Sequence, residues 1–511
     1  MKKLLLIMMV IFTITISAKE ITIFHLNDTH GHAWSFSEYN NPNIGGFAVI
    51  ESIMKQEGGK NSLFLHAGDI NTGVPESDMQ NCEPDIKALN IMNLCAMTVG
   101  NHEFDKTRKV LLEEMKMANF PFLSANIYKD GKLFFKPYII KEIDGIKIAI
   151  FGLTTEETEI LEPLYNKDLV FKNAVEVSKK LVPKLREKAD IIIALTHLGI
   201  GKSTSPKYTT SNELAEKVNG IDLIIDGHSH TNLEKPIIIN KTEIFQAKDF
   251  GEYLGKITVN YDQGKIQNIE WHKIPVNLKK YLGKDKDGKK QFSFVEKEYT
   301  PDAKVQALLK KYKEKGAEKL DNVICNSEIL LDGERPKVRS MDTNLSNLLT
   351  DAIRWKVGAD IALQNGGGIR SSIKPGKITT RDILTVLPFG NTLYVLNLKG
   401  SVIKSVLDFA AKIPAGKGSY LHTSGLTWTS ENGIPKNILV AGKKLDLNKT
   451  YKVVTNNYLA SGGDGYKIIG EHKSQGYDTG FTAASVLGEF MQKQLKGEIS
   501  SYSNVLRYKR K

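Results

Sequence analysis

Residues 94–105, "LCAMTVGNHEFD", run from an apolar segment directly into a cluster of polar side chains. A short apolar run that stops at a glycine predicts a buried β-strand followed by a tight turn. The turn would carry Asn101, His102 and Asp105 beyond the end of the strand. In α/β proteins such loops hold binding and catalytic residues, because the strands beneath them are rigid. We therefore expect a functional site at this edge of a sheet.

Four other apolar runs before residue 231 end in polar residues of the same kinds. They are "ITIFHL" (21–26), "SLFLHA" (62–67), "DIIIALT" (190–196) and "IDLIID" (221–226). Together with the first run they lead into Asp28, His30, Asp69, Asn101, His197, His228 and His230. A single histidine or aspartate beyond a strand is most often structural, but five strands that end alike indicate one shared site.

These side chains have the composition of a metal centre. They are too many for one four-coordinate ion and suit two ions that share a carboxylate, for which Asp69 is the candidate. Imidazole, carboxylate and amide ligands without a thiolate favour zinc, manganese, iron or cobalt. Two divalent ions beside only two carboxylates leave the centre positive, which favours an anionic substrate. Ions ~3.5–4 Å apart suit phosphoryl transfer, since they stabilise both the attacking and the leaving oxygen.

The chain is long enough for two or three domains, with 511 residues of which 41% are hydrophobic. Over residues 19–299, buried strands alternate with helix-length segments, and the last strands form hairpin patterns. This arrangement predicts a mixed α/β sandwich rather than a purely parallel sheet. Residues 321–511 contain further strand and helix patterns and predict a second α/β unit.

The connection between these units is predicted to be a boundary followed by a linker helix. Residues 275–300 are rich in lysine and turn residues, as expected of a boundary. Residues 300–320 have apolar side chains at helical spacing. Thr300 is the expected N-cap of this helix, and Pro301 would occupy its first position.

The second unit contains arginines and aromatic residues in glycine-rich segments. They are Arg335 and Arg339 in "GERPKVRS", Arg370 after "NGGG", Phe389 and Asn391 in "LPFGNT", and Tyr458 and Asp464 in "NNYLASGGDGY". The guanidinium group suits phosphate because it donates two parallel hydrogen bonds. Aromatic side chains in loops can fill a core, which is the usual case, or can stack on a nucleobase.

The amino-terminus has the layout of a cleaved secretory signal. Residues 1–18 contain two lysines, an apolar run from Leu4 to Ile16, and small residues before charge resumes. The alternative, a membrane anchor, is disfavoured because the run is shorter than the ~20 residues that a span needs. No later stretch is long and apolar enough to cross a bilayer. We therefore expect a secreted or periplasmic protein without a membrane span.

Charge and cysteine content restrict the partners. The formal net charge is +12, but the lysines are scattered, so small anionic molecules are expected as ligands rather than a nucleic-acid polymer.

Three cysteines are too few for a disulfide framework. A bridge between Cys82 and Cys95 is left open, with free thiols, including Cys325, as the default. A monomer is expected.

The polar strand ends also carry a family resemblance. The segments "HLNDTHGH" (25–32), "GDINTG" (68–73), "GNHEFD", "THLG" (196–199) and "GHSH" (227–230) resemble the signature blocks of calcineurin-like metallophosphoesterases. The intervening segments and the blocks after residue 325 further resemble the bacterial periplasmic 5'-nucleotidase/UDP-sugar hydrolase family. This resemblance implies an αββα metallophosphoesterase sandwich, joined by the linker helix to a C-terminal α/β domain that binds the nucleotide.

The resemblance implies roles for the residues of the first unit. One ion would be held by Asp28, His30, Asp69 and His230, and the other by Asp69, Asn101, His197 and His228. His102 would not bind metal but would donate hydrogen bonds to the phosphoryl oxygens, oriented by Asp105. A carboxylate three residues away stabilises an imidazolium, whose charge is most useful where negative charge develops. Glu103 and Phe104 are expected to cap and to pack.

The resemblance assigns the second unit to substrate binding. Phosphate would be bound by Arg335, Arg339 and Arg370, the base by Phe389 and Tyr458, other polar groups by Asn365 and Asn391, and ribose hydroxyls by Asp464. A rotation of the units would bring the base-stacking residues close to His102. Of the other histidines, His32 and His66 are close to the site in sequence. The remaining ones, His25, His272, His422 and His472, have no predicted partner.

The expected activity is hydrolysis of nucleoside 5'-monophosphates by two divalent ions. The resemblance extends the expected substrates to UDP-sugars and to nucleoside di- and triphosphates. One alternative is a 2',3'-cyclic nucleotide 2'-phosphodiesterase/3'-nucleotidase, although "NDTHGH" at residues 27–32 disfavours it. A second alternative is a non-catalytic nucleotide-binding protein, which the complete set of predicted ligands disfavours.

Overall fold

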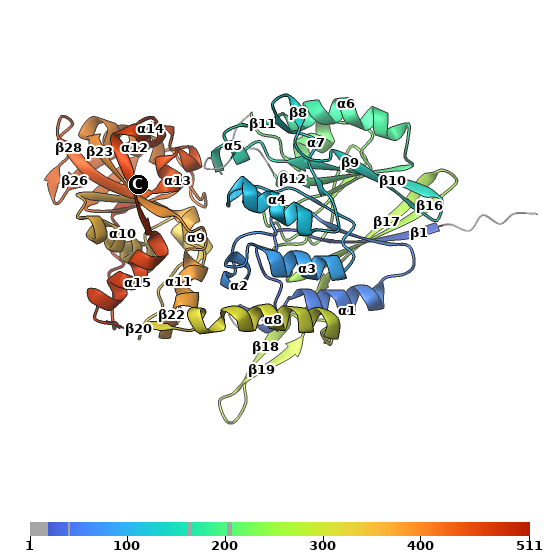
Figure 1. The fold of residues 1–511 in the computed structure, drawn as a ribbon, viewed down its shortest axis with the longest axis horizontal. Helices are drawn as coiled ribbons and strands as arrows, with labels where there is room; N and C mark the ends of the chain where they lie inside the picture. Colours follow the sequence, from blue (N-terminus) through green and yellow to red (C-terminus); the bar gives the residue numbers. More distant parts are fainter. Residues whose placement is uncertain (1–18, 39–40, 162–165, 202–206, 511) are drawn as a thin grey trace, which may run out of the picture.

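The computed structural model describes residues 19–38, 41–161, 166–201 and 207–510, so the predicted signal at residues 1–18 lies outside the described residues. The chain forms two α/β units that lie side by side (Figure 1). The first unit is built on two six-stranded sheets, and the second on a five-stranded sheet with smaller sheets beside it. The predicted fold class is confirmed.

The first sheet has the strand order β17-β16-β1-β4-β5-β6. Its strands are β1 (Lys19–Leu26), β4 (Ser62–His66), β5 (Ala96–Thr98), β6 (Phe122–Leu123), β16 (Tyr253–Asp262) and β17 (Lys265–Pro275). Strands β1, β4, β5 and β6 are parallel, and β16 closes the sheet by pairing antiparallel with β1 and β17. Because Leu26 pairs with His66 and His66 with Met97, the parallel strands end at one edge.

The second sheet has the strand order β14-β15-β13-β12-β10-β9. Its strands are β9 (Tyr138–Ile143), β10 (Ile146–Thr154), β12 (Ile191–His197), β13 (Leu223–Ile225), β14 (Ile237–Ile239) and β15 (Thr242–Phe245). The four inner strands are parallel and the two edge strands antiparallel. The antiparallel strands in both sheets explain the hairpin patterns in the sequence.

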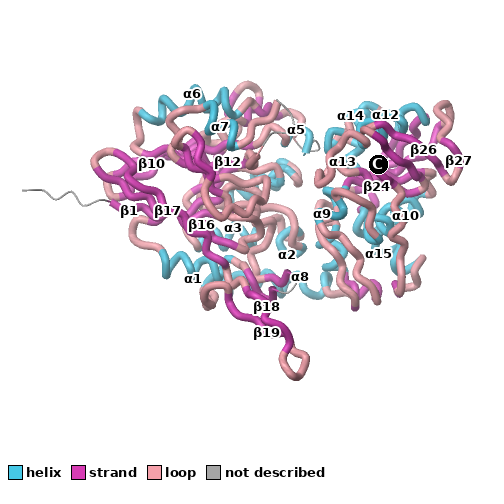
Figure 2. Tube along the Cα trace, turned by 180° about the vertical axis from the view of Figure 1, so that it is seen from behind, coloured by secondary structure: helices cyan, strands magenta, loops and turns pink. Residues whose placement is uncertain are grey.

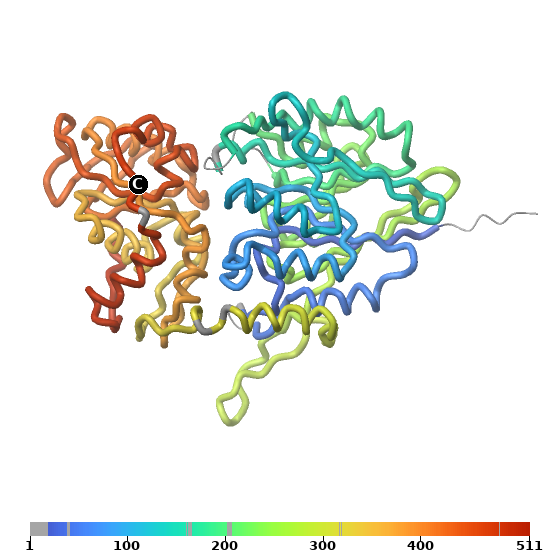
Figure 3. Tube along the Cα trace, in the orientation of Figure 1, coloured from blue at the N-terminus to red at the C-terminus, as the bar shows by residue number. Residues whose placement is uncertain are grey.

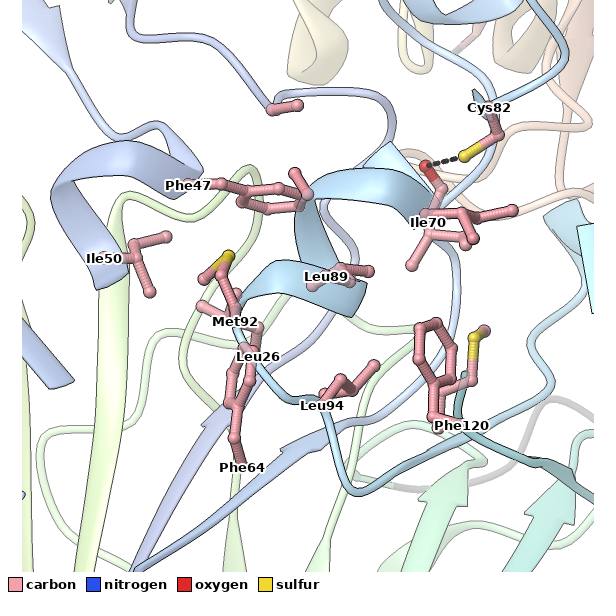
Figure 4. Close-up of a cluster of buried hydrophobic side chains, with 14 of the residues drawn as sticks. Leu26, Phe47, Ile50, Phe64, Ile70, Cys82, Leu89, Met92, Leu94 and Phe120 are labelled. Atoms are coloured by element: carbon pink, nitrogen blue, oxygen red, sulfur yellow. Dashed lines mark hydrogen bonds between the residues drawn. The ribbon is translucent and has the colours of Figure 1, made fainter. Parts of the chain in front are cut away.

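Three apolar layers hold this sandwich together. Ile21 and Ile23 of the first sheet meet Ile148 and Ile193 of the second in a core between the sheets. Helices α1 (Phe47–Glu57), α3 (Glu83–Ile91) and α4 (Arg108–Met117) cover the outer face of the first sheet, and α6 (Ala174–Arg186) and α7 (Ser211–Lys217) that of the second. Figure 4 shows part of the first outer layer, in which the thiol of Cys82 lies 3.7 Å from the carbonyl oxygen of Ile70.

The predicted start of the linker helix is wrong. Helix α8 (Ala303–Leu320) begins after Asp302, whose carboxylate accepts the backbone N–H groups of Lys304 and Val305. Thr300 and Pro301 precede it because the backbone N–H of Asp302 is bonded to Ala48 of α1, which fixes the entry of the chain. Val305 and Leu309 are buried in the outer layer of the first unit. The helix is thus packed along that unit, in yellow in Figure 3.

The lysine-rich segment expected as a boundary also has regular structure. It contains an antiparallel hairpin of β18 (Lys279–Lys284) and β19 (Lys290–Phe294), which projects from the molecule (Figure 1). The ring of Tyr281 lies 5.7 Å from that of Phe292 across the two strands. Lysines at exposed positions hid this strand pattern in the sequence.

The second unit has a five-stranded sheet with helices on both faces. Its strands, in the order β24-β21-β28-β23-β29, are β24 (Leu421–Ser424), β21 (Ile361–Asn365), β28 (Thr450–Asn456), β23 (Thr392–Lys399) and β29 (Gly476–Thr482). One face is covered by α10 (Asn344–Val357), α11 (Thr380–Val386) and α15 (Ala483–Lys493), the other by α12 (Gly400–Ala410). Figure 2 shows β24 and β26 (Ile434–Val440) of this unit from behind.

Candidate active site

Predicted site residues of both units line one cavity of about 1070 Å³. The first unit contributes Asp69, Asn101, His102, Asp105, His228 and His230, and the second Arg335, Arg339, Asn365, Arg370, Phe389, Asn391, Tyr458 and Asp464. Asp28, His30 and His197 are fully buried behind this surface. The structure therefore brings the two predicted sets of residues together at the junction of the units.

Asp28, His30 and His230 form one compact group of possible ligand atoms. The Nε2 atoms of His30 and His230 lie 3.2 Å apart, and His230 Nε2 lies 3.4 Å from Asp28 Oδ1. A second group contains Asp69, His197 and His228. Asp69 Oδ2 lies 3.0 Å from His197 Nε2 and 3.9 Å from His30 Nε2, so its carboxylate stands between the groups.

Asn101 completes the second group. Its Oδ1 atom lies 2.9 Å from His228 Nδ1, while its own backbone follows strand β5 as predicted. The residues Asp28, His30, Asp69, His228 and His230 all have φ between 46° and 74°. Such left-handed backbone is uncommon for these residues and is concentrated at functional sites, where the surrounding fold maintains the strain.

The two groups fit a pair of divalent ions. His197 Nε2 is buried and, among the described residues, makes no hydrogen bond despite its closeness to Asp69. The Nε2 atoms of His30 and His230 face each other at 3.2 Å, and both could bind one cation through their lone pairs together with Asp28. Nitrogen and oxygen donors of these kinds are common ligands of divalent transition-metal ions.

Residues that the sequence did not reveal hold the histidines in place. His197 Nδ1 lies 2.7 Å from the carbonyl oxygen of Ala67, and His230 Nδ1 lies 2.5 Å from Asp249 Oδ2. His228 Nε2 lies 3.6 Å from a carboxylate oxygen of Glu157, which also lines the cavity. The rings of His197 and His230 are thus fixed through Nδ1 while Nε2 faces the centre, as is usual for metal-binding histidines. Asp249 and Glu157 belong to no motif, so only the folded chain reveals them.

Glu103 has a larger role than the expected cap. Its buried carboxylate accepts the backbone N–H groups of Asp69, Ile70 and Gly100 at 3.0, 2.9 and 2.6 Å. It therefore ties the loop after β4 to the loop after β5. Burial raises the pKa of Glu103 to about 7. Phe104 packs in the outer layer as expected.

His102 and Asp105 form a pair at the cavity wall. His102 Nδ1 lies 2.9 Å from Asp105 Oδ2, which leaves Nε2 as the nitrogen directed away from the carboxylate. Burial opposes a charge on His102, but the carboxylates of Asp105 and Asp69 raise its pKa overall. The ring of Phe389 lies 5.7 Å from that of His102, with 20° between their planes. The pair can supply a positive donor to an anion in the cavity.

Three arginines converge on the cavity from the second unit. Arg335 Nη1 lies 2.9 Å from His230 Nδ1, and the Arg370 guanidinium lies 5.5 Å from the centre of the Phe389 ring. Arg339 Nε is buried without a hydrogen-bond partner among the described residues. Burial and the charge of Arg335 lower the pKa of Arg370 to about 10. Such crowding of positive charge is relieved when an anion binds.

The remaining predicted residues lie at one edge of the second unit's sheet. Asn365 ends β21 and Tyr458 follows β28, which is parallel to β21. Asn391 precedes β23, whose Leu393 pairs with Asn456 at the end of β28. Because β21 and β28 are parallel neighbours, Asn365 and Tyr458 lie at the same edge of the sheet although they are almost a hundred positions apart in the sequence.

Proteins from other bacteria match the chain over nearly its whole length. A 5'-nucleotidase of Vibrio vulnificus is 36% identical over 95% of this chain and 92% of its own. Protein UshA of Yersinia enterocolitica is 37% identical over 94% of this chain and 92% of its own. The chain belongs to the 5'-nucleotidase family. Within this member of the family, residues 21–232 match the calcineurin-like phosphoesterase model, and residues 323–471 match the 5'-nucleotidase C-terminal domain.

A solved structure supports the same family relationship. The 5'-nucleotidase precursor of Thermus thermophilus superposes on this 5'-nucleotidase family member with a TM-score of 0.81 at 30% identity. The match covers 96% of this chain and 99% of that one. The relationship therefore extends across both units and is not limited to the phosphoesterase region.

The three cysteines lie outside the site and are all unpaired. Cys82, Cys95 and Cys325 are free thiols, so a Cys82–Cys95 bridge is absent from the described chain. His66 Nε2 lies 3.1 Å from Thr29 Oγ1, which is between the predicted metal ligands Asp28 and His30 in the sequence. His422 is held by contacts of its ring nitrogens with Asp342 Oδ1 and the carbonyl oxygen of Val338. Within the described ranges, every helix is too short or too polar to span a bilayer.

Proposed function

We propose that the chain is a dimetal phosphomonoesterase that hydrolyses nucleoside 5'-monophosphates to nucleosides and phosphate. The observation that carries this proposal is the shared cavity, in which four of the seven predicted ligands and His102 face three arginines and two aromatic rings. Relatives at 36% and 37% identity named 5'-nucleotidase and UshA support it. UDP-sugars and nucleoside di- and triphosphates are included in the proposed substrate class.

The proposed metal ligands are those that the sequence predicted, with the ions sharing Asp69. When bound, two divalent ions would polarise the phosphoryl group and activate the attacking water. The imidazolium of His102 would donate from Nε2 to a phosphoryl oxygen while Asp105 holds Nδ1. This donor stabilises the negative charge that develops as the bond to the ribose 5'-oxygen breaks.

The second unit is proposed to select the substrate. Arg335, Arg339 and Arg370 would bind phosphate oxygens, and the base would lie between Phe389 and Tyr458. Asn365 and Asn391 are proposed to contact polar groups of the substrate, and Asp464 the ribose hydroxyls. We also propose the unit boundaries predicted from the sequence, a cleaved signal at residues 1–18, export to the periplasm and a monomeric state.

A substrate panel with metal exchange tests the proposal. The purified protein is treated with a chelator, reloaded separately with Zn²⁺, Mn²⁺, Co²⁺ or Fe²⁺, and assayed for phosphate release from 5'-AMP, 3'-AMP and 2',3'-cyclic AMP. We expect metal-dependent phosphate release to be far faster from 5'-AMP than from 3'-AMP or 2',3'-cyclic AMP. A preference for the cyclic or 3'-substrate supports the phosphodiesterase/3'-nucleotidase alternative. Nucleotide binding without any metal-dependent turnover supports the non-catalytic one.

A further inference from the structure

The carboxylate of Asp464 is held at both of its oxygens by neighbouring side chains. Asn365 Nδ2 donates to Oδ2 at 2.7 Å, and the Tyr458 hydroxyl donates to Oδ1 at 3.0 Å. The same hydroxyl accepts the backbone N–H of Asp464 at 3.1 Å. Tyr458 therefore fixes both the side chain and the backbone of Asp464.

A buried amide network fixes the orientation of Asn365. Its Oδ1 atom accepts hydrogen bonds from Asn456 Nδ2 at 3.0 Å and from Gln364 Nε2 at 3.1 Å. Asn456 also donates to Gln364 Oε1 at 3.1 Å. Because both acceptor contacts occupy the amide oxygen, the amide nitrogen must point toward Asp464. These hydrogen bonds give Asn365 a positioning role in addition to the substrate contact expected from the resemblance.

The ring and the hydroxyl of Tyr458 have separate contacts. A side chain at Gly463 would lie 2.6 Å from the ring, so one face of Tyr458 is covered by the backbone of that glycine. The ring is thereby supported for stacking on its other face. The hydroxyl, at the edge of the ring, contacts Asp464. Asp464 has φ 54°, a conformation that this hydroxyl helps to maintain.

A carboxylate held in this way can accept a limited number of further hydrogen bonds. An ionised carboxylate accepts about four hydrogen bonds and donates none. Tyr458 and Asn365 use one position on each oxygen, which leaves each oxygen able to accept one more hydrogen bond. Burial raises the pKa of Asp464, and the hydrogen bonds from Asn365 and Tyr458 oppose that shift. Both neighbours therefore favour the charged acceptor.

We infer that the Tyr458 hydroxyl and Asn365 are positioning groups that present Asp464 as a two-point acceptor for vicinal ribose hydroxyls. The site would thereby prefer ribonucleotides over 2'-deoxyribonucleotides. It would also disfavour nucleotides with a 3'-phosphate, because that group offers negative charge instead of a donor. A site built to bind a hydroxyl rejects the analogue that lacks it, since its acceptor is left unpaired. This inference rests on the proposed function and narrows its substrate class.

Tyr458→Phe separates the hydroxyl from the ring. We expect kcat/KM for 5'-AMP to fall by about five- to thirtyfold, mainly through KM, since one hydrogen bond to a charged group is lost. For 2'-deoxy-5'-AMP we expect a smaller fall, because that substrate makes only one of the two contacts to Asp464. Tyr458→Ala should lower kcat/KM for both substrates, because it removes the ring on which the base would stack. Tyr394→Phe is the matched control, since its hydroxyl donates to the carbonyl oxygen of Lys473 outside the cavity.

Nucleoside binding gives a second readout that needs no turnover. Adenosine and 2'-deoxyadenosine are titrated into the wild type and Tyr458→Phe by calorimetry. We expect the wild type to bind adenosine more tightly, and the variant to lose most of that preference. Equal loss for both nucleosides, or a wild type without ribose preference, would overturn the inference. A wild type that binds adenosine selectively but releases no phosphate would contradict the proposed function and leave this inference standing.

Discussion

Asn101 and His102 are neighbours in the chain but face different partners. Asn101 Oδ1 approaches His228 at the predicted metal centre, whereas His102 Nδ1 is bound to Asp105. The turn η1 (His102–Phe104) separates them by rotating the chain directly after strand β5. One loop therefore supplies a proposed metal ligand and a proposed donor to the phosphoryl group.

His102→Ala is expected to lower kcat for 5'-AMP by about 10²- to 10³-fold, because a preorganised donor to the transition state is lost. Metal content, measured by mass spectrometry on the same preparation, should stay at the wild-type value. His272→Ala is the control, since His272 is exposed beside Glu296 and does not line the cavity. Loss of metal in His102→Ala would mean that His102 is a ligand.

At the scale of single residues, the sequence predicted the residues that occur in motifs but not those that support them. The proposed ligands were recognisable because each follows an apolar strand. Asp249 supports His230 from a loop without a recognisable pattern. The resemblance assigned Asn365 to the substrate, but a sequence does not show that its amide also bonds to Asp464 and Asn456.

At the scale of secondary-structure elements, helix α4 buries a charged side chain that its sequence pattern would place at the surface. Glu114 lies three positions after the buried Leu111 and is itself buried. Its Oε2 atom accepts a hydrogen bond from Asn71 Nδ2 at 3.2 Å, in the loop that follows Asp69. Strands and helices were predictable from apolar periodicity, whereas a buried carboxylate on a helix was not, because its partner lies on another element. The start of α8 was missed for the same reason.

Glu114→Gln should change how stability depends on pH. Burial raises the pKa of Glu114 to about 8, so the folded chain keeps this group protonated where the unfolded chain ionises it. Its contribution is therefore fully present below pH ~4.5 and is lost as the pH rises toward 8. The melting temperature of Glu114→Gln relative to wild type should increase from pH 5 to pH 8 in calorimetry.

The neighbouring Glu113→Gln serves as the control for this measurement. Glu113 is on the same helix, its side chain is 52% exposed, and it lies 3.9 Å from Lys109. Its substitution should shift the melting temperature little and equally at each pH. A constant difference between Glu114→Gln and wild type across the range would show that Glu114 is not protonated in the folded protein.

At the scale of the whole molecule, two separately packed units meet around the cavity. Arg381 of α11 forms ion pairs with Glu76 of α2 (Pro75–Asp78) in the first unit and with Asp321 at the end of α8. The arrangement places Phe389 against His102. The sequence predicted two units and their complementary chemistry, but the contacts that set their relative position come from residues outside the motifs.

Arg381→Gln is expected to weaken 5'-AMP binding by about two- to fivefold with little change in kcat. Loss of a partly exposed ion pair reduces the population in which both units face the substrate, and apparent affinity falls with that fraction. KM for p-nitrophenyl phosphate, which lacks a nucleoside, should change less. Small-angle scattering should show a larger radius of gyration.

Arg186→Gln is the matched control, because Arg186 pairs with Asp222 at 2.6 Å within the first unit alone. It should leave both KM values and the radius of gyration as in the wild type. An unchanged KM for 5'-AMP in Arg381→Gln would show that this ion pair does not influence the arrangement of the units.

The position of β1 also affects how the protein must be made. The first described strand lies in the interior of its sheet, between β4 and β16, and β16 ends only at Asp262. During synthesis, one edge of β1 therefore stays without a partner until more than half of the chain exists. Exposed strand edges invite pairing with other chains. The fold thus leaves the nascent chain prone to aggregation at this strand edge until β16 has been synthesised.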